Sequence, residues 1–178
     1  RFTYIEKVID NRGGFSIMFK KVAVMAFSLT TLLASTCLAV VTGPIPDSEA
    51  SLGGITLGSP MSYVQSVYGA PNDRVPTKDY IHQDAFNNIY GNSFYVIEYP
   101  KDGTVEELYV TTNNGLATPL GITVGVPKST VDKLYGEGSF VQGSYRYLTQ
   151  EGKVIQIKYV TDDNDTPVVK SIYIRYPA

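Results

Sequence analysis

The sequence of 178 residues contains one cysteine, one histidine and no tryptophan. Cys37 lies in the apolar N-terminal region, so we expect no disulfide in the rest of the chain. His82 is the single imidazole and no thiol follows Cys37, so a zinc site lacks ligands. A Ser-His-Asp triad would need His82, but no serine lies in a Gly-x-Ser-x-Gly elbow. We therefore expect no enzymatic activity, no cofactor and no metal.

The N-terminal region changes character after residue 17. Residues 18–39 begin with the basic segment MFKK, continue with an apolar run and end in small residues, which is typical of a cleaved signal peptide. The apolar run is shorter than the roughly 20 residues of a membrane span, so we expect no transmembrane span in the mature chain. Residues 1–17 are interpreted as a mis-called gene start.

Cys37 allows a second interpretation, in which it is the acylated cysteine of a lipoprotein. The residues before it, Ala34-Ser35-Thr36, lack the leucine and the small residue that usually precede such a cysteine. We therefore expect cleavage and export to the periplasm or the medium, with an outer-membrane lipoprotein as the alternative.

The chain left after export is acidic. Removing residues 1–39 removes five basic and two acidic residues, which shifts the net charge from −2 to −5. An acidic chain without a basic stripe does not fit nucleic acid, so we expect no nucleic-acid partner. Residues 40–51 contain two prolines and are expected to form a flexible leader.

An internal duplication dominates the remaining sequence. Residues 54–69, GITLGSPMSYVQSVYG, recur as residues 121–136, GITVGVPKSTVDKLYG. We therefore expect two copies of one structural unit, at residues 52–115 and 116–178. The recurring positions are Gly54, Gly58, Pro60, Val64, Tyr68 and Gly69 in the first copy and Gly121, Gly125, Pro127, Val131, Tyr135 and Gly136 in the second.

Each copy of the motif predicts a short strand, a glycine turn and a short helix. Proline at the first helical position and glycine directly after the last one are typical helix boundaries. Ser59 is expected to cap the first helix. A helix of this length is not stable alone in water, so it should pack against a sheet.

Strand-like runs joined by polar turns follow each motif, which predicts antiparallel hairpins. Residues 72–88 remain undecided, because residues 77–84 fit either a strand or a second short helix. The expected fold class is α+β, with a tandem repeat of short helices packed on one face of a curved antiparallel β-sheet.

Strand alternation predicts a helix-free face of this sheet. Leu108 and Val110 should point toward the helices, as should their counterparts Ile172 and Ile174, because side chains alternate along a strand. Aligning Tyr99 with Tyr159 extends the prediction to the neighbouring strands. The side chains expected on the helix-free face are those of Tyr109, Thr111, Tyr173, Arg175, Val96, Glu98, Gln156 and Lys158.

Two interpretations of this face remain open. The tyrosines can serve strand propensity and cross-strand packing on a solvated face. Alternatively, tyrosine and arginine supply contact area and hydrogen bonds to a protein partner.

An acidic turn resembles the start of a calcium loop but lacks its later ligands. Asp162, Asp163 and Asp165 are not followed by glycine at the sixth place or glutamate at the twelfth. A polar hairpin turn is the interpretation that we favour.

A signal peptide followed by two Gly-Ile-x-x-Gly motifs, each ending in Tyr-Gly, resembles the superfamily of the beta-lactamase inhibitor protein and the SmpA/OmlA (BamE) envelope lipoproteins. It is also similar to small exported two-repeat proteins of outer-membrane-bearing Firmicutes. The resemblance implies a helix-loop-helix packed on one face of a curved antiparallel sheet, with the concave face free for a protein partner. Tandem PepSY-like units are the alternative fold.

These observations predict an exported, non-enzymatic module that binds a protein or peptide with the helix-free sheet face. An envelope assembly or structural lipoprotein of the SmpA/BamE type is one alternative. An inhibitor of an extracellular hydrolase is the other.

Overall fold

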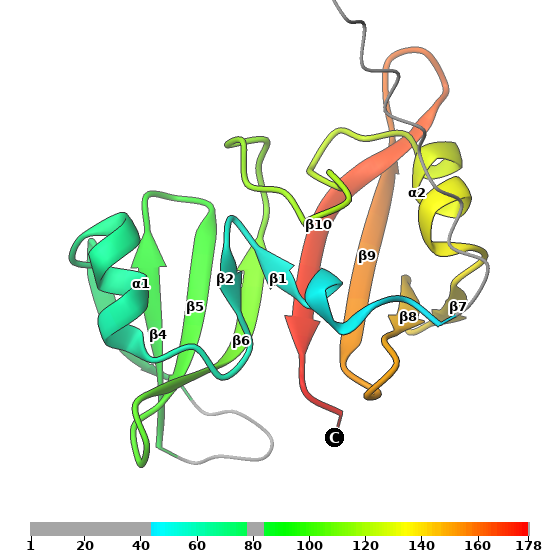
Figure 1. Ribbon diagram of the computed structural model, residues 1–178. Helices are drawn as coiled ribbons and strands as arrows, with labels where there is room; N and C mark the ends of the chain where they lie inside the picture. Colours follow the sequence, from blue (N-terminus) through cyan, green and yellow to red (C-terminus); the bar gives the residue numbers. More distant parts are fainter. Residues whose placement is uncertain (1–43, 78–83, 178) are drawn as a thin grey trace, which may run out of the picture. The chain divides into compact units, whose positions relative to one another are not determined.

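The computed structural model describes residues 44–77 and 84–177, and in this part of the chain the dominant element is one eight-stranded antiparallel sheet (Figure 1). All described residues belong to the compact part of the chain at Cys37–Ala178. Across the sheet the strands are β3 (Asp73–Thr77), β4 (Ala85–Tyr90), β5 (Phe94–Tyr99), β6 (Thr104–Val110), β10 (Pro167–Arg175), β9 (Val154–Thr161), β8 (Ser144–Leu148) and β7 (Ser139–Val141).

The expected α+β class, with tandem short helices packed on a curved sheet, is wrong, because the protein is mostly β. The described residues contain two α-helices of eight residues each, α1 (Met61–Tyr68) and α2 (Lys128–Tyr135). No second helix of a helix-loop-helix accompanies either one in the described chain. A 3₁₀ turn, η1 (Asp47–Glu49), and a two-stranded ribbon of β1 (Ser51–Leu52) and β2 (Ile55–Thr56) complete the described elements.

The undecided segment at residues 72–88 contains strands where the structure describes it. Asp73 to Thr77 form β3, and Ala85 begins β4, which pairs with β3. Residues 78–83 lie outside the described residues. This extra hairpin at the sheet edge is one reason why the chain contains more β-structure than expected.

The two halves of the sheet meet at its centre in a two-fold arrangement. Residues 52–115 supply β3 to β6 and residues 116–178 supply β7 to β10, and β6 pairs with β10. Tyr109 stands opposite its own counterpart, Tyr173. On either side of that pair, Val110 faces Ile172 and Leu108 faces Ile174. The two units therefore form one continuous sheet, related by a local two-fold axis between the two tyrosines.

The helix boundaries follow the motif with two differences in detail. Pro60 and Pro127 stand just before their helices as N-cap residues, and neither provides a side-chain cap. Ser59 does not cap α1 as expected, because its hydroxyl accepts a 3.3 Å hydrogen bond from the Thr56 N–H. Gly69 and Gly136 end the helices at φ values of 78° and 76°, which glycine adopts without strain.

The Gly-x-Pro part of each motif holds the chain against the last strand of its unit. The Gly58 N–H donates to the Val105 carbonyl at 2.7 Å, and the Val105 N–H donates back to Ser59 at 2.9 Å. The second unit repeats this exchange between Gly125, Val169 and Val126 at 2.8 Å in both directions. A β-bulge lies beside each of these reciprocal pairs of backbone hydrogen bonds. The Gly-x-Pro segment and the adjacent bulge therefore form one structural feature that occurs in both units.

The core lies on one side of the large sheet. The ribbon β1–β2 and the helices lie on that same side (Figure 1). Alternate strand residues point into it, and they include Phe94, Leu108, Ile157, Ile172 and Ile174. The packing partners from outside the sheet include Leu52, Ile55, Val64, Val131 and Leu134.

The two motif tyrosines have diverged in their contacts. The Tyr68 hydroxyl donates to the Gly53 carbonyl at 2.6 Å. The Tyr135 hydroxyl, in contrast, donates to the Glu49 carboxyl at 2.7 Å, and the Thr118 hydroxyl lies 2.9 Å away. Glu49 is 2% exposed, so Tyr135 is a main partner of a buried carboxyl group. Burial first, and then the hydrogen bond and charge of Glu49, raise the pKa of Tyr135 far above its usual range.

We expect Tyr135→Phe to lower the free energy of unfolding by about 1–3 kcal/mol, because it leaves a buried carboxyl group without its hydroxyl partner. The matched change Tyr68→Phe removes one hydrogen bond to a backbone carbonyl and should cost only about 0.5–1.5 kcal/mol. Urea unfolding of both variants measures the difference. Equal losses of stability in the two variants would show that the Tyr135 hydroxyl is not needed to stabilise the buried carboxyl group of Glu49.

Stability should also fall at alkaline pH. A tyrosine whose pKa is raised in the folded state contributes stability below the unfolded value of about 10, and this contribution is lost as the pH rises above that value. We expect the wild type to lose more stability than Tyr135→Phe between pH 8.5 and about 11. Urea midpoints across this range test the expectation, and parallel curves for the two proteins would contradict it.

Candidate binding face

The outer face of the large sheet, opposite the core, carries a row of side chains across the junction of the two units. The pairing places Tyr95 beside Tyr109, Tyr109 beside Tyr173, Tyr173 beside Gln156 and Gln156 beside Arg146. These positions alternate with buried core positions such as Leu108 and Ile172, which explains why they share the other face.

The predicted pair Tyr109 and Tyr173 lies at the centre of this row. Their ring centroids are 5.8 Å apart with a 90° angle between the ring planes, an edge-to-face contact. Tyr95, which the sequence analysis missed, extends the aromatic group, because its ring lies 5.7 Å from that of Tyr109. The three rings form an aromatic strip across β5, β6 and β10.

Three further predicted residues lie around this strip. Lys158 is exposed on β9, paired with Ser171 on β10, and it shares the outer face with the tyrosines. Arg175 lies two residues after Tyr173 on β10 and therefore on the same face, and its guanidinium donates to the Tyr176 carbonyl at 2.9 Å. Thr111 follows the end of β6, and its N–H donates to Ser93. Of these three, only Lys158 joins the central tyrosines at a cavity.

The predicted orientation of Val96 and Glu98 is wrong. Val96 is fully buried in the core and pairs with Leu108, a core residue. Glu98 pairs with the buried Val105, and its carboxylate lies 3.2 Å from Arg74 and 3.1 Å from the Asn88 amide nitrogen. Neither residue belongs to the outer face.

The error comes from a one-residue shift in aligning the two units. The sheet makes Val96, opposite Leu108, the counterpart of Ile157, opposite Ile172. The Tyr99–Tyr159 alignment had instead matched Ile97 with Ile157. Because side chains alternate with a period of two, a shift of one residue moves a side chain to the opposite face. Ile97 accordingly points outward, although it is only 9% exposed.

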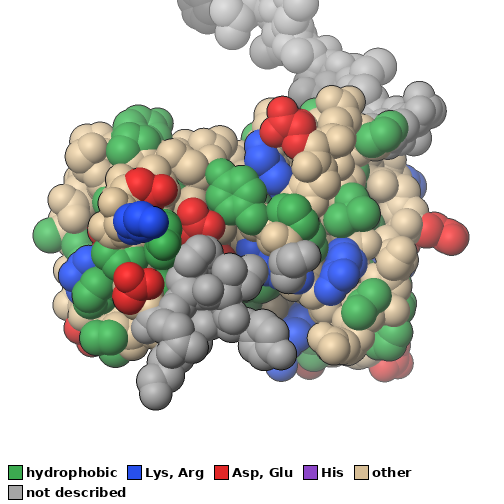
Figure 2. Space-filling view, turned by 90° about the horizontal axis from the view of Figure 1, so that it is seen from below, with side chains coloured by type: hydrophobic (Ala, Val, Ile, Leu, Met, Phe, Trp, Pro, Cys, Tyr) green, Lys and Arg blue, Asp and Glu red, His purple; other side chains and the backbone are tan. Residues whose placement is uncertain are grey.

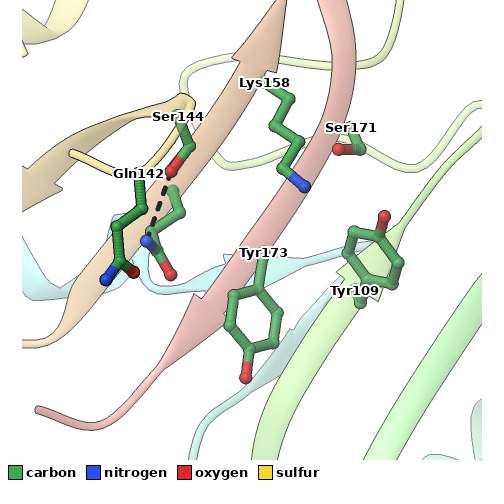
Figure 3. Close-up of a pocket in the computed structure, with 7 residues that line it drawn as sticks. Tyr109, Gln142, Ser144, Lys158, Ser171 and Tyr173 are labelled. Carbon is green, nitrogen blue, oxygen red and sulfur yellow. Dashed lines mark hydrogen bonds between the residues drawn. The ribbon is translucent and has the colours of Figure 1, made fainter. Parts of the chain in front are cut away.

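A cavity of about 380 Å³ opens on the outer face beside the central tyrosines (Figure 3). Figure 3 shows Lys158 extending from β9 over β10, with Tyr109 and Tyr173 projecting from neighbouring strands. Among the described residues, the polar groups that line the cavity are hydroxyls, amides and one ammonium group, and none is a carboxylate. The lining residues are Tyr109, Gln142, Ser144, Gln156, Lys158, Ser171 and Tyr173.

Four of these lining residues were not among the predicted binding residues, although the position of Gln156 on the outer face was expected. Ser144 and Gln156 are joined across β8 and β9 by a 3.4 Å hydrogen bond from the Gln156 amide. Gln142 lies in the turn before β8 at a φ of 49°. Ser171 follows the bulge on β10, and no sequence pattern marks it. These positions depend on register and turn geometry, which the sequence pattern does not specify.

The remaining sequence candidates lie elsewhere. Cys37 and His82 fall outside the described residues. Asp162 accepts hydrogen bonds from the Asn164 and Thr166 N–H groups at 2.9 and 2.8 Å, as in a polar hairpin turn. Within residues 44–77 and 84–177 no cluster of three or more metal-binding side chains occurs. In the same residues no helix is both long and apolar enough to cross a membrane.

Comparison with known proteins assigns no family. No family model matches the chain, and no curated protein matches it. One similar solved structure is a cysteine-rich secretory protein from Staphylococcus aureus, with 16% identity and a TM-score of 0.48. The match covers 75% of this chain and 48% of that one, so this chain spans about half the length of that protein.

We expect side-chain truncation to affect stability differently on the two faces of the sheet. Val96→Ala should lower the free energy of unfolding by about 1.5–3 kcal/mol, because it leaves a cavity in a packed core. Lys158→Ala should change it by no more than about 0.5 kcal/mol, as for an exposed side chain. Chemical unfolding of both variants gives the comparison. A tolerated Val96→Ala would mean that the register of β5 is misassigned.

Proposed function

We propose that this chain is an exported, non-enzymatic module that binds a protein or peptide on the outer face of its large sheet. The observation that carries the proposal is the Tyr109–Tyr173 pair bordering the 380 Å³ cavity at the junction of the two units. Tyrosine offers broad contact area and a hydroxyl with little loss of side-chain entropy, which favours protein recognition. The proposed export rests on the signal pattern of residues 18–39.

The size and chemistry of the cavity support this class of partner. Its volume is within the range of about 300–1,000 Å³ that is typical of ligand pockets. Its walls combine two aromatic rings with amide and hydroxyl groups, which can pair with the N–H and C=O groups of a peptide. Among the described residues, the polar groups that line the cavity are hydroxyls, amides and one ammonium group, all of which can bind a peptide by hydrogen bonds.

Selection from a peptide-display library against the full chain tests this function. We expect enriched peptides that bind the wild type and lose at least tenfold in affinity for the double variant Tyr109→Ser, Tyr173→Ser. Both tyrosines are partly exposed, so the double variant should stay folded, which circular dichroism can verify. Tyr63→Ser is the control, because Tyr63 is 46% exposed on α1, away from the outer face. Failure to enrich any peptide, or equal binding by the folded double variant, would contradict the proposal.

A further inference from the structure

The cavity lies at positions where the two units differ on the outer face. Around the local two-fold axis, Tyr109 corresponds to Tyr173, and the pair Ile97–Glu107 corresponds to the pair Lys158–Ser171. By the same relation, Gln156 of the second unit stands where Tyr95 stands in the first. Core positions near the axis, in contrast, keep apolar residues in both units, such as Leu108 and Ile172 or Val96 and Ile157.

These exchanges alter both the size and the charge of the face. Serine in place of glutamate, and glutamine in place of tyrosine, replace large side chains by smaller ones beside Tyr173. Lysine in place of isoleucine adds a positive charge, and the loss of the glutamate removes a negative one. The second unit therefore has a cavity lined by the ammonium group of Lys158. The first unit has larger side chains and the carboxylate of Glu107 at the corresponding positions.

The charges around the cavity favour a negatively charged occupant. Lys158 has no ion-pair partner within the described part of the chain. Arg146 lies on the same face beside Gln156, and its buried Nε atom has no hydrogen-bond partner among the residues that the structure describes. An ammonium group and tyrosine and serine hydroxyls can all donate hydrogen bonds to a carboxylate, and the charged donor makes the strongest of them.

The preference for a negatively charged occupant is confined to the cavity, because the chain as a whole has a net charge of −2. On the side shown in Figure 2, charged groups of both signs are interspersed with apolar ones. No broad positive field is evident on that side to attract anions from a distance. We assign the selectivity for an acidic group to the donors inside the cavity.

We propose that this cavity binds the carboxylate of an Asp or Glu side chain in an acidic peptide segment of the partner, with Lys158 as its cationic contact. The proposal rests on the proposed function, because it specifies what the same face recognises. A volume of about 380 Å³ exceeds what one carboxylate fills, and it leaves room for the adjoining part of the peptide against Tyr109 and Tyr173.

The test uses three pentapeptides that are acetylated and amidated at their ends, with Glu, Gln or Lys between flanking alanines. Their dissociation constants for the full chain are measured by NMR titration. We expect the Glu peptide to bind at least fivefold more tightly than the Gln peptide, with the Lys peptide weakest. The preference should shrink as salt is raised, since Lys158 is exposed.

Two substitutions replace cavity residues by their counterparts in the first unit, Ile97 and Glu107, and test the role of each position. Lys158→Ile should abolish the preference for Glu over Gln, and Ser171→Glu should both fill the cavity and repel the acid. Lys101→Gln is the matched control, because Lys101 is exposed in the turn between β5 and β6, outside the cavity lining. It should leave the preference within twofold of the wild type. Thermal unfolding checks that each variant is folded.

The outcomes separate this inference from the function on which it rests. If display yields peptides that depend on Tyr109 and Tyr173 but the Glu preference is absent or survives Lys158→Ile, the acidic partner is wrong and the function stands. A fourth peptide, with central Gln and a free C-terminal carboxylate, tests the source of the acid. If it binds and the amidated Glu peptide does not, the side-chain assignment is overturned.

Discussion

The pairing of β6 with β10 is the constraint on which the rest of this structure depends. It joins two copies of a four-strand unit, each of which has few residues with which to form a core alone, into one sheet with a single shared core. The two-fold register of this pairing puts Tyr109 against its own counterpart Tyr173 on the outer face and Leu108 against Ile174 in the core. The same register therefore determines both the packing of the core and the chemistry of the exposed face.

Duplication left the two faces under different constraints. On the core side, the backbone hydrogen bonds of the Gly-x-Pro segments, the bulges and many apolar positions recur in both units, because a change there leaves a void or an unpaired backbone group. On the outer face, substitution costs little stability, and the units have diverged in size and charge at the positions around the axis. The cavity beside Lys158 is the result of that divergence, within a framework that stayed symmetric.

Local patterns in the sequence predicted the local features and failed where the answer depended on register. Gly69 and Gly136 do end the helices, and Leu108, Val110, Ile172 and Ile174 are all fully buried, because these follow from turn chemistry and from alternation within one strand. The fold class was wrong because two eight-residue helices were given too much weight and the strands near residues 72–88 too little. Val96 and Glu98 were misplaced because the units differ in the length of the loop that follows this strand, which put the Tyr99–Tyr159 alignment one residue out of register. Ser144 and Gln142 contribute to the cavity through a turn that no motif marks.

If the proposed function is right, the asymmetry between the units creates the binding site and the shared framework does not. Mapping amide chemical-shift changes across the sheet during titration with the Glu pentapeptide tests it most directly. We predict changes centred on Lys158, Ser171 and Tyr173, with little change at the corresponding Ile97 and Glu107 across the two-fold axis. Equal changes at both sets of positions, or changes confined to the sheet edges β3 and β7, would contradict the claim.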